Sequence, residues 1–143
     1  MERMIRGRAL VAGEVEAEAL VADEPLSFWG GYDQLTGEII DRRHPLSGQI
    51  AAGRALALPS SRGSSTTTAV LLESVKSGKA PAAIVTVSVD YFFSLASIVA
   101  GEMYGKMFPI VTIAPEDFAT LRTGLWIKVC SNGALIVRTG AVL

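Results

Sequence analysis

The sequence predicts an α/β fold in which β-rich ends surround a βαβαβ middle. In the middle of the chain, short apolar segments rich in β-branched residues alternate with helical segments, which is typical of parallel strands joined by crossover helices. At both ends, strand-like segments follow one another with only glycine-containing turns between them. No internal repeat or linker interrupts the 143 residues, so we expect a single domain over residues 1–143.

The first elements in the chain are two expected strands, at residues 6–12 and 15–22. Apolar and acidic residues alternate in the second segment, which is the pattern of a strand with one buried face. Gly13 lies between the two segments. We therefore expect either an antiparallel hairpin or one long bulged strand.

The next region combines large aromatic residues with two adjacent glycines. We expect Phe28 and Trp29 to pack in the core or in a subunit interface, and residues 38–41 to form a short strand. Asp33 begins a turn in which its side chain can bond the backbone two residues later. His44 is the one histidine, and histidine changes charge near neutral pH, so it is a candidate site residue.

The middle and the C-terminal part predict the remaining elements. We expect strands at 53–59, 83–87 and 109–113, helices at 65–78, 91–104 and 115–121, and a hairpin of strands 125–130 and 134–138. Asp90 is a good N-cap, while Gly78 and Gly105 are suited to helix C-termini. Asn132 and Gly133 are a strong signal for the hairpin turn. The helix at 91–104 is apolar nearly all round, which predicts burial on more than one side or a place at an interface.

The composition argues against several classes of protein. The chain has 13 basic and 14 acidic residues, so it offers no electrostatic basis for binding nucleic acid or a membrane surface. No apolar run is long enough to span a membrane and no signal peptide follows the first arginines, so we expect a cytoplasmic protein. With 50% hydrophobic residues, the chain exceeds what one small core needs, which favours a partner-binding face.

Metal binding by this chain alone is not expected. The sequence contains one cysteine, Cys130, and one histidine, His44. Structural zinc sites and iron–sulfur clusters need several ligands at defined spacing. The lone cysteine cannot form a disulfide within the chain and fits a reducing compartment. Any metal chemistry would therefore come from a partner.

The stretch from Ser60 to Thr68 is the strongest candidate for chemistry. It is a polar loop between an expected strand and an expected helix, and it places Gly63, Ser64 and Ser65 at the helix N-terminus. Unpaired backbone N–H groups and the helix dipole there can bind an anion or stabilise negative charge on a hydroxyl oxygen. A simpler alternative stays open, in which Ser64 is an ordinary helix N-cap.

Several motifs in combination resemble the small, swivelling-domain subunit of the aconitase X family. The resemblance runs from near residue 5 to near residue 140. Its matching pieces are Gly7-Arg8-Ala9, Ser27-Phe28-Trp29-Gly30-Gly31-Tyr32-Asp33, Thr36-Gly37, Gly53-Arg54 and the loop from Pro59 to Ser65. The resemblance implies a swivelling β/β/α domain like the fourth domain of aconitase.

The resemblance also implies a function and a division of labour. A large subunit would hold an iron or iron–sulfur centre that acts as Lewis acid on the departing hydroxyl group, in a heterodimer or larger assembly. Ser64 would be the base that removes a proton from the neighbouring carbon. Arg62 could bind a substrate carboxylate, while Gly63, Ser65 and Thr66 are further candidates for substrate binding. The chain would thus be a subunit of a hydro-lyase acting on a small hydroxy acid.

The loop favours one substrate branch of the family over another. Aconitase has Gly-Ser-Ser-Arg-Glu here, whereas Thr66 and Thr67 follow Ser65 in this chain, so a citrate-like tricarboxylate is not expected. The loop also has few basic residues for a phosphate. We therefore expect dehydration of cis-3-hydroxy-L-proline to pyrroline-2-carboxylate, with the small subunit of phosphomevalonate dehydratase as the alternative. A non-catalytic anion-binding module or a structural swivel domain remains open as well.

Overall fold

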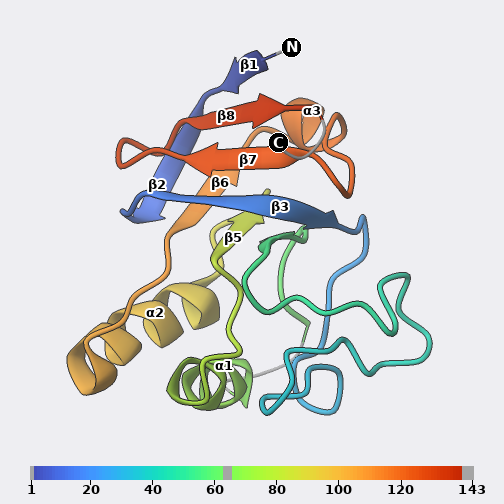
Figure 1. Cartoon of the computed structure of the whole chain (residues 1–143), viewed down its shortest axis with the longest axis vertical. Helices are drawn as coiled ribbons and strands as arrows, with labels where there is room; N and C mark the ends of the chain where they lie inside the picture. Colours follow the sequence, from blue (N-terminus) through green and yellow to red (C-terminus); the bar gives the residue numbers. More distant parts are fainter. Residues whose placement is uncertain (1, 63–65, 140–143) are drawn as a thin grey trace.

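The structure of the chain is a computed structural model that describes residues 2–62 and 66–139 (Figure 1). Its elements are β1 (Glu2–Ile5), β2 (Gly7–Val11), β3 (Val15–Val21), β4 (Ala55–Ala57), α1 (Thr66–Lys76), β5 (Ala83–Thr86), α2 (Tyr91–Tyr104), β6 (Ile110–Ile113), α3 (Pro115–Phe118), β7 (Trp126–Val129) and β8 (Leu135–Arg138). The middle of the chain is β4-α1-β5-α2-β6, with the other strands at the two ends. This order confirms the predicted α/β fold with β-rich ends.

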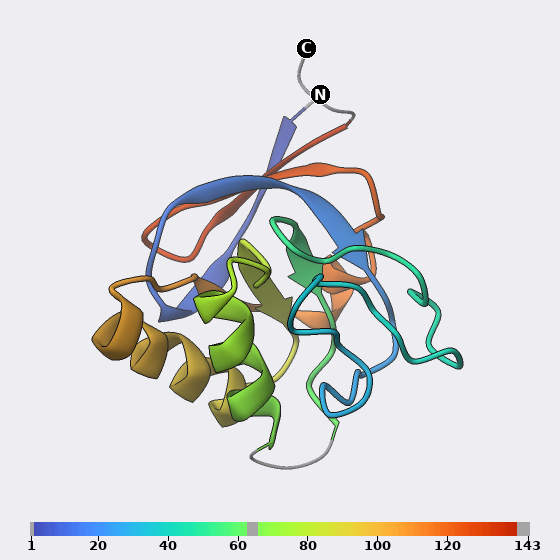
Figure 2. The same cartoon turned by 60° about the horizontal axis from the view of Figure 1, so that its bottom comes forward.

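The strands form one curled sheet. Their order is β1-β8-β7-β3-β4-β5-β6-β2, with parallel pairing from β3 through β6 and antiparallel pairing elsewhere. Only Arg6 separates β1 from β2 in sequence, yet these strands lie at opposite ends of the order. The sheet must therefore curl until its two edges approach each other near this residue. Figure 2 shows β3 arching over the strands that lie behind the helices.

Both predicted arrangements of the first two strands, an antiparallel hairpin and one long bulged strand, are wrong. Residues 6–12 and 15–22 do contain β2 and β3, but β2 pairs with β6, and β3 pairs with β7 and β4. Residues 38–41 take part only in isolated bridges instead of the predicted strand. The sequence also gives no signal for β1, because three of its four side chains are exposed. The other predicted strands and helices are present, although α3 ends three residues earlier than predicted.

The sheet has a hydrophobic core on each face. One core joins side chains of most strands with Phe118 of α3, and the other lies on the face covered by α1 and α2. Strand β4 shows the division, because Ala55 and Ala57 belong to the first core while Leu56 belongs to the second. A parallel strand buried on both faces gives a continuous apolar run, which is why the sequence predicts this strand well.

Helices α1 and α2 lie side by side on one face of the sheet (Figures 1 and 2). As predicted, Asp90 caps α2, and its side chain accepts hydrogen bonds from the backbone N–H groups of Phe92 and Phe93. Gly105 ends α2 with a φ of 67°, and Gly78 follows α1 with a φ of 74°. These left-handed conformations favour glycine, so both helix ends are specified by the sequence.

Helix α2 is buried on one side only. Phe93, Ala96 and Ala100 face the core, whereas Tyr91 and Leu95 are exposed. The predicted burial of α2 on more than one side is therefore wrong, and the alternative, a place at an interface, stays a prediction that its apolar exposed side favours. None of the described helices has both the length and the apolar character that a membrane span requires.

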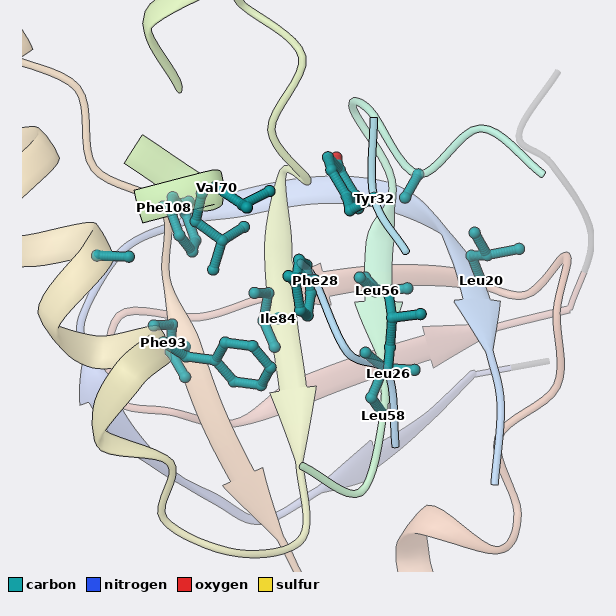
Figure 3. Close-up of a cluster of buried hydrophobic side chains, with 14 of the residues drawn as sticks. Leu20, Leu26, Phe28, Tyr32, Leu56, Leu58, Val70, Ile84, Phe93 and Phe108 are labelled. Atoms are coloured by element: carbon teal, nitrogen blue, oxygen red, sulfur yellow. The ribbon is translucent and has the colours of Figure 1, made fainter. Parts of the chain in front are cut away.

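Phe28 and Tyr32 carry the segment after β3 into the core beneath the helices (Figure 3). The ring of Phe28 stacks on Tyr32 at a centroid distance of 5.3 Å and meets Phe93 edge-on at 5.5 Å. The hydroxyl group of Tyr32 donates to the carbonyl group of Lys79 over 2.7 Å, and burial raises the pKa of Tyr32 above its ordinary value. Gly31 permits this turn, because a Cβ atom there would lie 2.1 Å from a backbone oxygen.

Candidate active site

The candidate site lies where β4 and β5 end and the helices α1 and α2 begin. Ligands of α/β proteins commonly bind in loops at the carboxyl ends of parallel strands. Here the loop after β4 can be followed to Arg62, and the loop after β5 runs through residues 87–90. Because both helices start at this edge, the positive ends of two helix dipoles face it. At the start of α2 the carboxylate of Asp90 already occupies this positive end, which leaves the start of α1 to favour further negative charge.

The described part of the β4–α1 loop is tied to the core. The N–H group of Leu58 donates to the carbonyl group of Val85 in the neighbouring strand over 3.0 Å. At the other end, the N–H group of Arg62 donates to the carbonyl group of Leu26 over 2.9 Å, and Leu26 forms an isolated parallel bridge with Ser61. Leu26 is fully buried. The backbone at Ser61 and Arg62 is thus held by a residue of the core.

Asp90 joins the two loops. Its Oδ1 atom accepts hydrogen bonds from the N–H groups of Phe92 and Phe93 over 3.0 and 3.2 Å. Its Oδ2 atom accepts from the N–H group and the hydroxyl group of Ser61 over 2.7 and 2.6 Å. Only 8% of Asp90 is exposed. One carboxylate therefore both caps α2 and holds the loop after β4.

Two further hydrogen bonds connect the same elements. The hydroxyl group of Ser88 donates to the carbonyl group of Pro59 over 3.4 Å, which joins the two loops a second time. The hydroxyl group of Thr68, in the first turn of α1, donates to the carbonyl group of Phe92 in α2 over 3.1 Å. The starts of both helices are therefore fixed relative to each other.

A surface hollow of about 240 Å³ lies between the two loops. It is lined by Ser60, Ser61, Ser88, Val89, Asp90, Tyr91 and Phe92. Serine hydroxyl groups line one part and apolar groups the other, so the hollow can take a small ligand that has both kinds of surface. Another hollow, of about 200 Å³, lies near Pro81 and Phe108, at the opposite ends of β5 and β6.

The described part of the chain includes only some of the central predicted residues. Ser64, Gly63 and Ser65 lie outside the described residues, so their predicted roles stay predictions. Helix α1 begins at Thr66, which agrees with the predicted start of a helix directly after the loop. Arg62 is exposed, and its guanidinium group takes part in none of the ion pairs among the described residues.

The other predicted residues lie in the long segment between β3 and β4, and none of them lines the hollow. Phe28 is buried in the core, whereas Trp29 is 71% exposed. The side chain of Asp33 accepts a hydrogen bond from the N–H group of Leu35 over 2.8 Å, as expected for a turn aspartate. Their roles as site or interface residues stay predictions.

His44 is buried, and neighbouring backbone groups fix its ring. Its Nδ1 atom accepts a hydrogen bond from the N–H group of Leu46 over 3.1 Å, so Nε2 carries the proton. The Nε2 atom lies 3.3 Å from the carbonyl oxygen of Glu24, to which it donates. Both ring nitrogens thus have structural partners.

The sequence analysis identified Asp90 only as a helix cap and did not connect it with Ser61. A signal was available, because consecutive parallel strands place their following loops at the same edge of a sheet. A carboxylate that starts the second helix therefore comes close to the serine-rich loop before the first. The sequence shows both features but not the hydrogen bonds between them.

The residues that the structure describes do not fit a metal centre. Among them, no three or more histidine, cysteine, aspartate or glutamate side chains are grouped so that they could hold a metal ion. His44 already uses both ring nitrogens. An iron centre of the kind implied by the resemblance therefore finds no set of ligands in this part of the chain.

Comparison with known proteins gives consistent matches over almost the whole chain. The family model described as the aconitase X swivel domain matches residues 4–137. Cis-3-hydroxy-L-proline dehydratase of Pseudomonas aeruginosa is 45% identical over 90% of this chain, but the match covers only 22% of that enzyme. The chain thus spans about a fifth of the length of this curated relative.

Two further relatives match over nearly their full length. The phosphomevalonate dehydratase small subunit of Thermococcus onnurineus is 33% identical over 92% of this chain and 95% of that subunit. A crystal structure described as the holo-form of aconitase X from Thermococcus kodakaraensis superposes with a TM-score of 0.84. It shares 30% identity and covers 94% of this chain and 98% of that one.

Proposed function

Since the chain belongs to the aconitase X swivel-domain family, we propose that it is the small subunit of a hydro-lyase that works together with a large subunit. The observation that carries this proposal is the pattern of coverage. The chain matches 95% of a protein named as a small subunit and 22% of a dehydratase that is a much longer chain. We assign the remaining parts of such an enzyme to a large subunit, as the name of the small-subunit relative implies.

We assign the removal of the substrate proton to Ser64. A serine hydroxyl group is a weak base in water and needs stabilisation of its alkoxide form. The positive end of the α1 dipole supplies a field of the required sign, whereas the start of α2 is already occupied by the carboxylate of Asp90. The tied backbone at Ser61 supports the assignment, since a base must be held accurately to act.

The substrate would bind near the hollow between the two loops. Arg62 is the basic residue of the described loop, and its exposed guanidinium group is suited to bind a carboxylate. The iron or iron–sulfur centre is assigned to the large subunit, because the described residues offer no ligand set for it. In this proposal the chain supplies the catalytic base, Ser64, and the residues that position this base.

The proposed substrate is cis-3-hydroxy-L-proline, which loses water to give pyrroline-2-carboxylate. The higher identity to a hydroxyproline dehydratase, 45% against 33%, supports this choice. The loop residues 58–62 and 87–90 contain one basic side chain, Arg62, which fits a monocarboxylate better than a phosphorylated acid. The near-complete coverage of a phosphomevalonate dehydratase small subunit favours 5-phosphomevalonate as the second candidate.

An assay of the co-expressed small and large subunits tests the proposed substrate. We expect the complex to form pyrroline-2-carboxylate from cis-3-hydroxy-L-proline and to leave 5-phosphomevalonate unchanged. The trans isomer of the imino acid serves as the matched control, because its hydroxyl group leaves from the other face of the ring. Turnover of only the phosphorylated acid would move the protein to the second candidate. No turnover of either compound would favour a non-catalytic anion-binding module.

A further inference from the structure

Asp90 makes more contacts than a helix cap requires. A cap needs one oxygen atom that accepts from the first N–H groups of its helix, and serine or asparagine serves about as well as aspartate. In Asp90 the Oδ1 atom alone fills this role. The Oδ2 atom instead binds Ser61, a residue 29 positions earlier in the chain. The contacts of the Oδ2 atom are thus not needed to cap α2 and require another explanation.

The bonds to Ser61 are well suited to holding a backbone in place. Both the N–H group and the hydroxyl group of Ser61 donate to the same Oδ2 atom, at 2.7 and 2.6 Å. Hydrogen bonds to a carboxylate are shorter and stronger than those between neutral groups. Asp90 is itself rigid, since it is buried and its other oxygen atom is fixed by α2. Ser61 is therefore tied to the residue that caps the start of α2.

We propose that Asp90 is a positioning residue of the dehydratase, whose Oδ2 atom holds Ser61, three positions before Ser64 in the sequence, and thereby contributes to the placement of the base. This inference rests on the proposed function, because it presupposes that Ser64 removes the proton. A displacement of a catalytic group by about 1 Å can lower a rate about 10²-fold. The loss of the Ser61 contacts therefore affects the proton-removal step more than the binding of substrate.

The replacement Asp90→Ser separates the two tasks of this residue. Serine keeps the cap of α2 but is too short to bind Ser61 as well. In the complex of small and large subunits, we expect kcat to fall about 10- to 100-fold and KM to change less than kcat does. We also expect a larger kinetic isotope effect with substrate deuterated at the carbon that loses its proton, because that step becomes slower relative to the others.

Two further variants serve as controls. Asp41→Ser alters an aspartate whose side chain, among the described residues, accepts only a local hydrogen bond, from the N–H group of Arg43. This variant is expected to leave the rate and the isotope effect unchanged. Ser61→Ala removes only the bond between its hydroxyl group and Asp90 and leaves α2 fully capped. It should lower kcat in the same way, but less strongly. If Asp90→Ser does not fold, kcat of the Ser61→Ala variant tests the positioning role instead.

Combination with Ser64→Ala distinguishes a failure of this inference from a failure of the proposed function. If Ser64→Ala keeps full activity, the assigned base is wrong whatever the Asp90 variant does. If Ser64→Ala lowers the activity to a measurable residual level, Asp90→Ser should cause no further loss in that background. Full activity of Asp90→Ser, or a loss that multiplies with that of Ser64→Ala, would overturn the positioning role.

Hydrogen exchange gives a readout that needs no substrate. In the chain alone, we expect the Ser61 amide to exchange about tenfold faster in Asp90→Ser than in the original protein, because its acceptor is lost. The Leu58 amide, which donates to Val85, should keep its rate. An unchanged Ser61 amide would show that Asp90 does not hold this part of the loop.

Discussion

Replacement of Ser64 by alanine is expected to lower kcat of the proposed dehydratase complex by about 10²- to 10⁴-fold, the usual contribution of a general base. KM should change little, because the hydroxyl group acts in the transition state more than in substrate binding. Residual turnover is expected from the remaining groups that bind and orient the substrate. Steady-state kinetics of the purified complex with cis-3-hydroxy-L-proline measure this effect.

A matched control for this substitution is Ser47→Ala. Ser47 is an exposed serine in the segment between β3 and β4, and its replacement should leave kcat within about twofold of the original value. Equal kinetics of the Ser64 and Ser47 variants would mean that the base lies elsewhere, on the large subunit or in another loop of this chain.

Phe93→Ala is expected to cause the largest loss of stability. Phe93 is fully buried in α2 and packs edge-on against Phe28. Truncation of a buried phenylalanine to alanine typically lowers the free energy of unfolding by about 3–5 kcal/mol, since it removes apolar contacts and leaves a cavity. Urea unfolding of the isolated chain, followed by circular dichroism, measures the change.

Leu95→Ala is the control on the same helix. Leu95 is 50% exposed, so its replacement should alter the free energy of unfolding of the isolated chain by no more than about 0.5 kcal/mol. Similar losses in both variants would argue against the packing of α2 described above. A normal unfolding curve for Phe93→Ala would do the same.

The sequence predicts the central βαβαβ unit well because each of its elements carries a local signal. β4 and β5 are buried on both faces and give continuous apolar runs. Gly78 and Gly105 lie at helix C-termini, where left-handed backbone is required. The partner of β2 is β6, about 100 residues later, and no local pattern specifies such a pairing. The curl of the sheet follows from this long-range pairing and could not be predicted.

The candidate site is likewise predicted only in part. The loop around Ser64 stands out chemically, since glycine and serines precede a helix. The link from Asp90 to Ser61 depends on β4 and β5 being neighbours, which becomes visible only in the folded sheet. Phe28 has an aromatic side chain that suits either a core or an interface, and its place in the core depends on the packing of α2.

Reconstitution of the enzyme from separate subunits tests the central claim most directly. The purified chain would be added in increasing amounts to the large aconitase X subunit of the same organism, with cis-3-hydroxy-L-proline as substrate and pyrroline-2-carboxylate as the measured product. We expect neither subunit alone to form product, and the rate of the mixture to rise until the two subunits reach a fixed ratio. Full activity of the large subunit alone would contradict the account, because this chain would then contribute no essential group.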